Sequence, residues 1–172
     1  MDPRCWAWAA FALSTGLRPS EQCVLTYDDI INGKAVVNKA QDLDGSEKDP
    51  KNKGSKRKVD LAPLAHEAVE VMRKYTTSTI FQNPWTKRPW SGSRSQHENI
   101  WSPTYKALGI SARRGYCSRH TYATQMLAAG ARVAQVSAQM GHTTPSQVER
   151  KYAKWLPADD GGAVARAFGV SE

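Results

Sequence analysis

Residues 118–152, SRHTYATQMLAAGARVAQVSAQMGHTTPSQVERKY, form the stretch that decides the fold of this chain. Apolar residues recur twice in it at the i, i+3, i+4 spacing of a helical face, and each run ends at a glycine, Gly130 and then Gly141. Thr144 and Pro145 next supply an N-cap and a first helical position. The stretch therefore predicts three successive helices joined by short turns.

Three polar side chains stand near the ends of these predicted helices. Arg119 lies near the start of the first, His142 just past the end of the second, and Tyr152 one to two turns into the third. Arginine holds a phosphate through a bidentate fork, tyrosine can attack phosphorus, and histidine can donate a hydrogen bond or move a proton. Taken singly, each residue is more often a core, surface or capping residue. Their joint spacing is what favours one cleft suited to a phosphodiester.

Composition sets the class of protein and its partners. The chain has 172 residues, which suits one domain, and a net charge of +8, which favours a polyanionic partner over a merely basic protein. No apolar run is long enough to span a membrane, and the acidic start predicts no signal peptide. Cys5, Cys23 and Cys117 are too widely spaced for a zinc site or a disulfide framework. We therefore expect a cytoplasmic protein without a membrane partner.

The N-terminal part predicts two helices. Trp6, Ala10 and Leu13 mark one face of an opening helix that ends at Gly16. Pro19 can start a second helix, and Arg18 just before it would then stand at an N-terminus, where the helix dipole favours anions.

The next segment predicts a small antiparallel sheet. Residues 25–31 enter a first strand, Asn32-Gly33 is typical of a type I′ turn, and residues 35–37 form the return strand. Residues 41–56 are polar and form a loop or a twisted hairpin, and alternating apolar residues in 57–61 indicate a third strand.

A further helix and a tryptophan-rich segment follow. The helix starts at residues 62–64, and its predicted core face consists of Ala65, Ala68, Val69 and Met72. In residues 76–102, Trp85, Trp90 and Trp101 alternate with basic residues. Such a segment either lies along a nucleic acid or places its tryptophans in the core. Residues 101–108 predict a helix that packs toward the site.

These motifs together resemble the tyrosine recombinases, the phage-integrase family, over nearly the whole chain. Arg119-His120-Thr121, Gly141-His142 and Tyr152 match the C-terminal motif of that family in order and distance. Residues 15–21, TGLRPSE, resemble its first box, and residues 152–157, YAKWLP, resemble the ending of phage and genomic-island integrases.

The resemblance implies a role for each matching residue. Arg18 and Arg119 would clamp the scissile phosphate, and Tyr152 would attack it and form a 3′-phosphotyrosyl DNA intermediate. Glu21 would be the buried acid that supports the site. A lysine on the hairpin would protonate the leaving 5′ oxygen, and the run PKNKGSKRKV places it at Lys51, with the second lysine of that run, Lys53, as the alternative.

One position departs from the family pattern. Most members carry His-x-x-Arg, whereas here Tyr116 stands three residues before Arg119. A phenol can hydrogen-bond a phosphate oxygen, as His142 would, but it is a poor proton acceptor near neutral pH. His120 is expected to pack behind the site rather than to react.

The family resemblance implies an α+β, mostly helical catalytic domain over residues 1–172 with a three-stranded antiparallel sheet. We expect that the arm domain that precedes the catalytic domain in the family is not part of this sequence. The expected function is site-specific DNA recombination, the integration or excision of a phage or mobile element, without cofactor or metal. The expected partner is double-stranded DNA in a bacterial or phage-infected cell. A homo-tetramer held through the C-terminal tail and accessory DNA-bending proteins would complete the assembly.

Two other functions stay open. A type IB topoisomerase uses the same kinds of residue to relax supercoils. A DNA-binding module without catalysis is the second alternative, and Tyr116 is the one feature that favours it.

Overall fold

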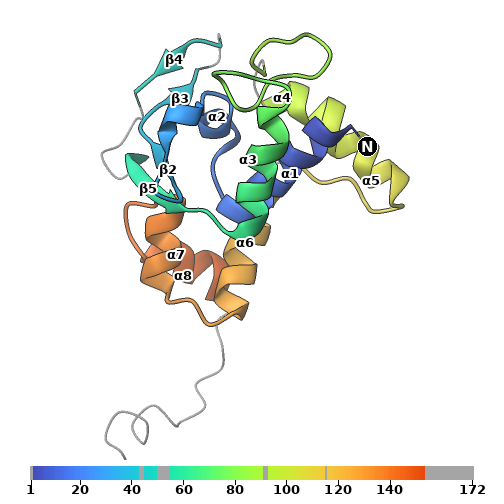
Figure 1. Cartoon of the computed structure of the whole chain (residues 1–172). Coiled ribbons are helices and arrows are strands. Elements are labelled where there is room, and N and C mark those ends of the chain that lie inside the picture. Colours follow the sequence, from blue (N-terminus) through green and yellow to red (C-terminus); the bar gives the residue numbers. More distant parts are fainter. Residues whose placement is uncertain (1, 43–44, 50–54, 91–92, 115, 154–172) are drawn as a thin grey trace, which may run out of the picture.

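The computed structural model describes residues 2–42, 45–49, 55–90, 93–114 and 116–153, and they form an α+β, mostly helical fold as predicted (Figure 1). The helices are α1 (Pro3–Thr15), α2 (Pro19–Gln22), α3 (Pro63–Arg73), α4 (Ser93–Gln96), α5 (Ser102–Ala107), α6 (Cys117–Ala128), α7 (Val133–Met140) and α8 (Ser146–Tyr152). A 3-10 turn covers Tyr27–Asp29 and a π turn covers His97–Trp101. The strands are β1 (Ile30–Ile31), β2 (Lys34–Val37), β3 (Ala40–Gln41), β4 (Glu47–Lys48) and β5 (Arg57–Asp60).

The predicted three-stranded antiparallel sheet is present, in the order β1-β2-β5. Asn32 and Gly33 have φ angles of 49° and 72°, the two left-handed residues that a type I′ turn requires. Ala35 in β2 pairs with Val59 in β5, and both side chains are buried. The first strand is shorter than expected because residues 27–29 form the 3-10 turn. The hairpin reading of the polar segment is confirmed where the structure describes it, since β3 pairs with β4.

Helix α1 is the centre of the larger apolar core. It ends at Gly16, as predicted, with a φ of 63°. The predicted face is wrong at Leu13, which is exposed. Because α1 packs against both α3 and α6, its buried surface is wider than one stripe. The side chains that it buries are Cys5, Ala7, Trp8, Ala10, Phe11, Ala12 and Thr15.

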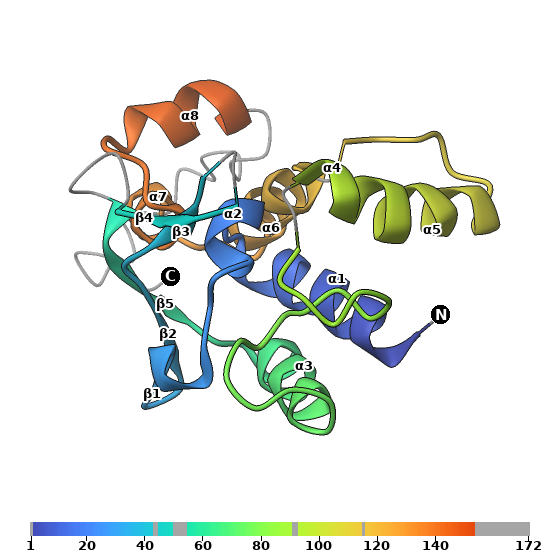
Figure 2. The same ribbon diagram turned by 90° about the horizontal axis from the view of Figure 1, so that it is seen from above.

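The predicted face of α3 is confirmed, since its buried residues are Ala65, Ala68, Val69 and Met72. The tryptophan segment divides between the two interpretations. Trp90 and Trp101 are buried in the larger core, whereas Trp85 is 58% exposed. The expectation that residues 101–108 pack toward the site is wrong, because α5 buries no side chain and extends away from α7 and α8 (Figure 2).

The three helices predicted from residues 118–152 are α6, α7 and α8, and they enclose a second apolar cluster. Its buried members are Tyr122, Ala123, Leu127, Val136, Met140, Val148 and Tyr152. Helix α8 starts at Ser146, slightly later than predicted, with Pro145 as its N-cap. Helix α6 also contacts α1, and α7 contacts β5, so this cluster lies against the larger core. None of the helices in the described part of the chain has the length and apolar character that a membrane span requires.

Candidate active site

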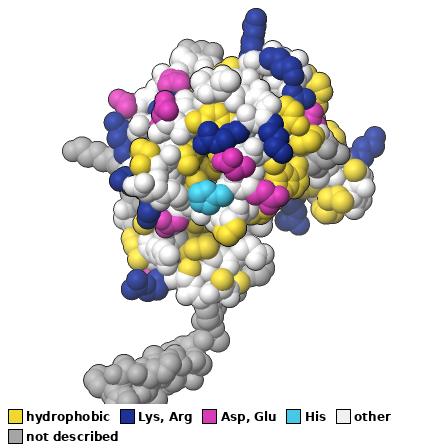
Figure 3. All heavy atoms as spheres, viewed as in Figure 1, with side chains coloured by type: hydrophobic (Ala, Val, Ile, Leu, Met, Phe, Trp, Pro, Cys, Tyr) yellow, Lys and Arg dark blue, Asp and Glu magenta, His cyan; other side chains and the backbone are white. Residues whose placement is uncertain are grey.

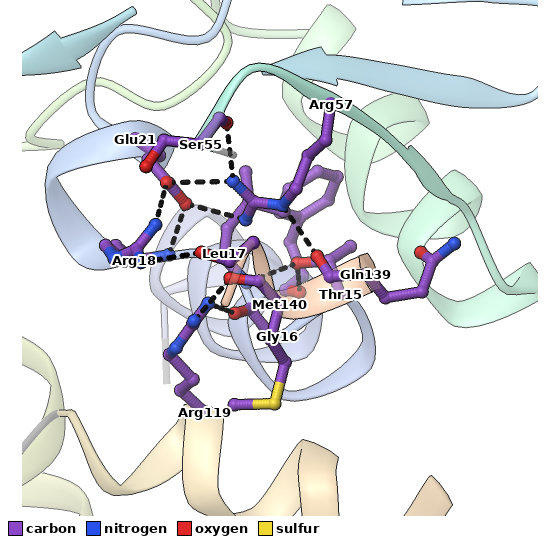
Figure 4. A network of polar contacts seen from close by, with 12 residues as sticks. Thr15, Gly16, Leu17, Arg18, Glu21, Ser55, Arg57, Arg119, Gln139 and Met140 are labelled. Atoms are coloured by element: carbon purple, nitrogen blue, oxygen red, sulfur yellow. Dashed lines mark hydrogen bonds and ion pairs between the residues drawn. The ribbon is translucent and has the colours of Figure 1, made fainter. Parts of the chain in front are cut away.

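The C-terminal end of α7 organises the candidate site. The last carbonyl groups of a helix have no partner within it, and they lie at the negative end of the helix dipole. Here the consecutive carbonyls of Gln139, Met140 and Gly141 each accept a hydrogen bond from a different arginine (Figure 4). The donors, in the same order, are Arg57, Arg119 and Arg18. One helix end therefore gathers three cationic groups from three distant parts of the chain.

Arg18 stands where the sequence predicts, directly before α2. Its Nη1 lies 2.7 Å from Oε1 of Glu21, and its Nη2 lies 3.1 Å from the carbonyl oxygen of Gly141. Glu21 is 2% exposed, which confirms the expected buried acid. Burial alone would raise the pKa of Glu21, but the hydrogen bonds and charge of Arg57, with the charge of Arg18, lower it below its usual value. An ionised carboxylate thus fixes the Arg18 guanidinium, which stays 31% exposed.

Arg57 is a residue of the site that the sequence analysis missed, because it considered residues 57–61 only as a strand. It is 7% exposed, and its Nη1 and Nη2 each lie 2.9 Å from one oxygen of Glu21. Its Nε donates to the Gln139 carbonyl at 2.7 Å. The sequence did contain a signal, since Arg57 shares the inward face of a strand with Val59, two residues on.

Arg119 lies entirely inside the protein, with 0% exposure. Its Nη1 donates to the Gly16 carbonyl at 2.6 Å and its Nη2 to the Met140 carbonyl. Burial lowers the pKa of Arg119 to about 10, so the group stays charged at neutral pH. Among the described residues, its Nε has no hydrogen-bond partner. A buried cation with unused donors is suited to an anion that carries its own oxygen acceptors.

His142 follows Gly141, which ends α7 in the left-handed conformation with a φ of 65°. Burial, then the positive charges of Arg119 and Arg18, lower the pKa of His142 to about 4. The imidazole is therefore neutral near pH 7. Within the described residues, its Nδ1 is a second buried nitrogen without a hydrogen-bond partner.

Tyr152 is the last residue of α8 and is 4% exposed. Its hydroxyl lies 2.6 Å from Nδ1 of His120. His120 was expected to pack behind the site, and the structure places its imidazole, which α6 carries, directly against this hydroxyl. Burial raises the pKa of Tyr152, and the charge of Arg119 opposes that rise.

Of the remaining predicted residues, the structure describes Tyr116 but neither of the two candidate lysines. Tyr116 is 42% exposed, and its ring meets the His120 ring edge-on with centroids 5.4 Å apart. Lys51, Lys53 and the predicted C-terminal tail lie outside the described residues.

Arg119 lies within electrostatic reach of three other predicted residues, Arg18, His142 and Tyr152. The charge of Arg119 alters the pKa of both His142 and Tyr152, and the charge of Arg18 alters that of His142. No group of three His, Cys, Asp or Glu side chains in the described part of the chain could hold a metal ion. On the face in Figure 3, Lys and Arg side chains are spread over several elements with Asp and Glu among them. The dense grouping of arginines lies at the end of α7, where Arg57 and Arg119 are buried and Arg18 is partly exposed.

The comparisons with known proteins agree on one family. The sequence matches the model of the phage integrase family over residues 4–158. Prophage integrase IntR of Escherichia coli (strain K12) is 28% identical over an alignment that covers 85% of this chain and 42% of that protein. The chain therefore spans less than half the length of this relative.

Solved structures show the same fold at low sequence identity. The Tn1549 transposon integrase, in complex with a circular intermediate DNA, is 19% identical with a TM-score of 0.73, over 94% of this chain and 57% of the other. XerA recombinase is 18% identical with a TM-score of 0.69, over 98% of this chain and 56% of the other. With the family match over most of its length, the chain belongs to the phage integrase family.

Proposed function

We propose that this chain is the catalytic domain of a site-specific recombinase that cuts and rejoins double-stranded DNA through Tyr152. The observation that carries the proposal is the end of α7, which gathers Arg18 and Arg119 beside His142. Two buried nitrogens there, Nε of Arg119 and Nδ1 of His142, have no hydrogen-bond partner among the described residues. Buried polar atoms are normally satisfied, and a phosphate oxygen would satisfy both.

The charge of the site supports a phosphodiester rather than a neutral substrate. The scissile phosphate gains negative charge in the transition state, and fixed cations in a water-poor site stabilise that charge most. Arg119 has five N–H donors and uses two of them on carbonyl oxygens, which leaves donors for the phosphate. Because Arg119 is fully buried here, DNA binding must also uncover its guanidinium.

The proposed reaction stores the energy of the broken bond. The Tyr152 oxygen attacks phosphorus, the P–O5′ bond breaks, and the DNA 3′ end becomes a phosphotyrosyl ester. Lys51, with Lys53 as the alternative, donates the proton to the leaving 5′ oxygen. Tyr116 and His142 donate hydrogen bonds to the phosphate oxygens. Rejoining reverses these steps, so neither a nucleotide nor a metal cofactor is proposed.

The assembly is part of the same proposal. Exchange between two DNA sites requires one nucleophile for each of four strands, so we propose that the chain acts as a homo-tetramer on DNA. The C-terminal tail would link the protomers, and DNA-bending proteins would assist.

A nicked suicide DNA tests the proposal. The substrate carries the crossover site of the element that encodes this chain, with a labelled 3′ phosphate at the scissile position. We expect a protein–DNA adduct that survives SDS, absent in Tyr152→Phe and retained in Tyr75→Phe, which alters an exposed tyrosine just after the end of α3.

The outcomes separate the candidate functions. An adduct on the crossover site that depends on Tyr152 supports recombination. Relaxation of supercoiled DNA lacking that site would favour a topoisomerase. Binding of the site without any adduct, in a protein of the length of its relatives, would leave a DNA-binding module.

A further inference from the structure

The imidazole of His120 lies against the atom that would react. Its Nδ1 is 2.6 Å from the Tyr152 hydroxyl oxygen, and the two ring centroids are 5.8 Å apart. Of the described side chains, His120 is the one that hydrogen-bonds this hydroxyl. The inference below rests on the proposed function, in which that oxygen attacks phosphorus.

The hydrogen bond has a defined direction. Burial, then the charges of Lys151 and Arg119, lower the pKa of His120, so its imidazole is neutral at pH 7. A neutral imidazole has one acceptor nitrogen, and the phenol has one proton to donate. The arrangement that uses both has the Tyr152 hydroxyl donating to Nδ1, with the imidazole proton on Nε2.

Tyr152 needs a proton acceptor in order to attack. Burial raises the pKa of its phenol, so the hydroxyl stays protonated near neutral pH. The position where the family usually carries histidine holds Tyr116, itself a poor acceptor. Burial, then the charges of Arg119 and Arg18, lower the pKa of His142 to about 4, which makes its imidazole a weak proton acceptor. Among the described residues, it is His120 and not His142 that hydrogen-bonds the Tyr152 hydroxyl.

We propose that His120 is the general base that removes the proton of Tyr152 during strand cleavage. As the Tyr152 oxygen bonds to phosphorus, its O–H bond breaks and the proton moves to Nδ1. The P–O5′ bond breaks at the same time, and the 5′ oxygen takes its proton from the lysine proposed above. In rejoining, the imidazolium returns its proton to the phenolate oxygen as the 5′ hydroxyl attacks.

The local structure holds His120 for this role. Successive residues of a helix point about 100° apart, so α6 directs Arg119 toward α1 and α7 while it directs His120 toward α8. Tyr116 stands one turn earlier, and its ring meets the imidazole nearly perpendicularly, at 72°. This edge contact restrains the imidazole in the orientation that faces Tyr152.

The test compares His120→Asn with the parent in single-turnover adduct formation on the suicide DNA. Asparagine can place an acceptor oxygen near the Nδ1 position but cannot take up a proton. We expect a loss of about 100-fold in rate, the lower range for general base catalysis. The parent rate should rise with pH as the imidazole loses its proton, at a pKa below 6.5. This rise in the pH–rate profile should be missing in His120→Asn.

A second substrate distinguishes the proposed general base, His120, from the proposed general acid, Lys51. In a DNA with sulfur in place of the bridging 5′ oxygen, the leaving thiolate needs little protonation because thiols have a pKa near 8.5. This substrate should restore the rate of Lys51→Ala but not that of His120→Asn. His66→Asn, on the exposed side of α3, is the control for mutating a histidine.

Each result has one meaning. A parent that forms no Tyr152-dependent adduct would refute the proposed function and this inference with it. If the adduct forms, any one of three results would overturn the inference alone: a parental rate in His120→Asn, an unchanged pH dependence in that variant, or rescue of that variant by the sulfur substrate. Circular dichroism and binding of the same DNA show whether a slow variant is folded.

Discussion

Arg57 is the residue on which the geometry of Arg18 and the end of α7 both depend. Arg57→Leu leaves the buried Glu21 carboxylate with Arg18 as its remaining cation, and breaking a buried ion pair costs about 3–5 kcal/mol. We expect a loss of that size in the free energy of unfolding, measured by urea denaturation. Arg57→Lys should lose less, because it keeps the charge but not the two-bond fork.

The neighbouring lysine is the matched control. Lys56 has a side chain that is 57% exposed, so Lys56→Ala should change stability by no more than about 0.5 kcal/mol. Replacing both partners, Arg57→Leu with Glu21→Leu, should recover part of the loss. Equal costs for Arg57→Leu and Lys56→Ala would show that the ion pair does not stabilise the fold.

His142 should make the protein sensitive to acid. Its pKa is lowered to about 4 in the folded protein, from an ordinary value of 6.5. Between these values the unfolded state binds more protons, so stability falls as pH drops from 6.5 toward 4. His142→Asn should therefore reduce the shift in the urea midpoint between pH 7 and pH 4.5.

The comparison of the parent with His142→Asn above neutral pH is the control for this prediction. Between pH 7 and pH 8 the parent and His142→Asn should show parallel urea midpoints, because the imidazole is neutral in both states of the parent. His120 contributes in the same direction in acid, since its pKa is also lowered, so some sensitivity should remain. An unchanged acid profile in His142→Asn would contradict the burial of its imidazole.

Sequence reasoning selected candidate residues for the site more readily than it predicted their contacts. Arg18, Arg119, His142 and Tyr152 could be selected because their spacing matches a motif. Nothing in the sequence shows that Arg119 and His120, adjacent on one helix, face different elements. That depends on where α1, α7 and α8 pack around α6, which is a tertiary property.

At the scale of elements, Gly16 sets how closely α1 approaches α6. Its φ is 63°, and a Cβ built there would lie 2.4 Å from Cδ1 of Tyr122. Gly16→Ala should therefore combine backbone strain with overpacking. We expect it to cost at least about 1 kcal/mol more in unfolding free energy than backbone strain alone.

Gly130 supplies the matched control for that substitution. Its φ is 83°, but a Cβ there meets no atom within 4 Å, so Gly130→Ala should show the strain alone, about 1–2 kcal/mol. Combining Gly16→Ala with Tyr122→Ala should cost less than the sum of the two. If both glycine variants lose the same stability, the contact between α1 and α6 does not require a glycine.

Glycines that end helices and the regular spacing of apolar residues also explain which elements could be predicted. The ends of α1 and α7, the type I′ turn and the buried face of α3 follow from local rules, and all four were predicted correctly. The exposed Leu13 and the position of α5 were not, because they depend on which neighbours cover each helix. The burial of Arg57 likewise depends on Glu21, which lies 36 residues away.

At the scale of the whole molecule, the site joins two apolar clusters. Arg119 links the carbonyl of Gly16, at the end of α1, with that of Met140, at the end of α7. In the described part of the chain it makes no ion pair, and a buried charge without a counterion is costly. An anion that binds there should therefore stabilise the entire fold, because it binds the folded state and not the unfolded one.

Inorganic phosphate tests this coupling without DNA. At ten times its dissociation constant, phosphate should add about 1.4 kcal/mol of stability, which raises the Tm of a domain of this size by about 4 °C. Arg119→Met removes the charge but keeps an unbranched side chain, so its Tm should not respond beyond a chloride control at equal ionic strength. Equal phosphate responses in the parent and the variant would show a general salt effect, and Arg119 would then not be the centre of an anion site.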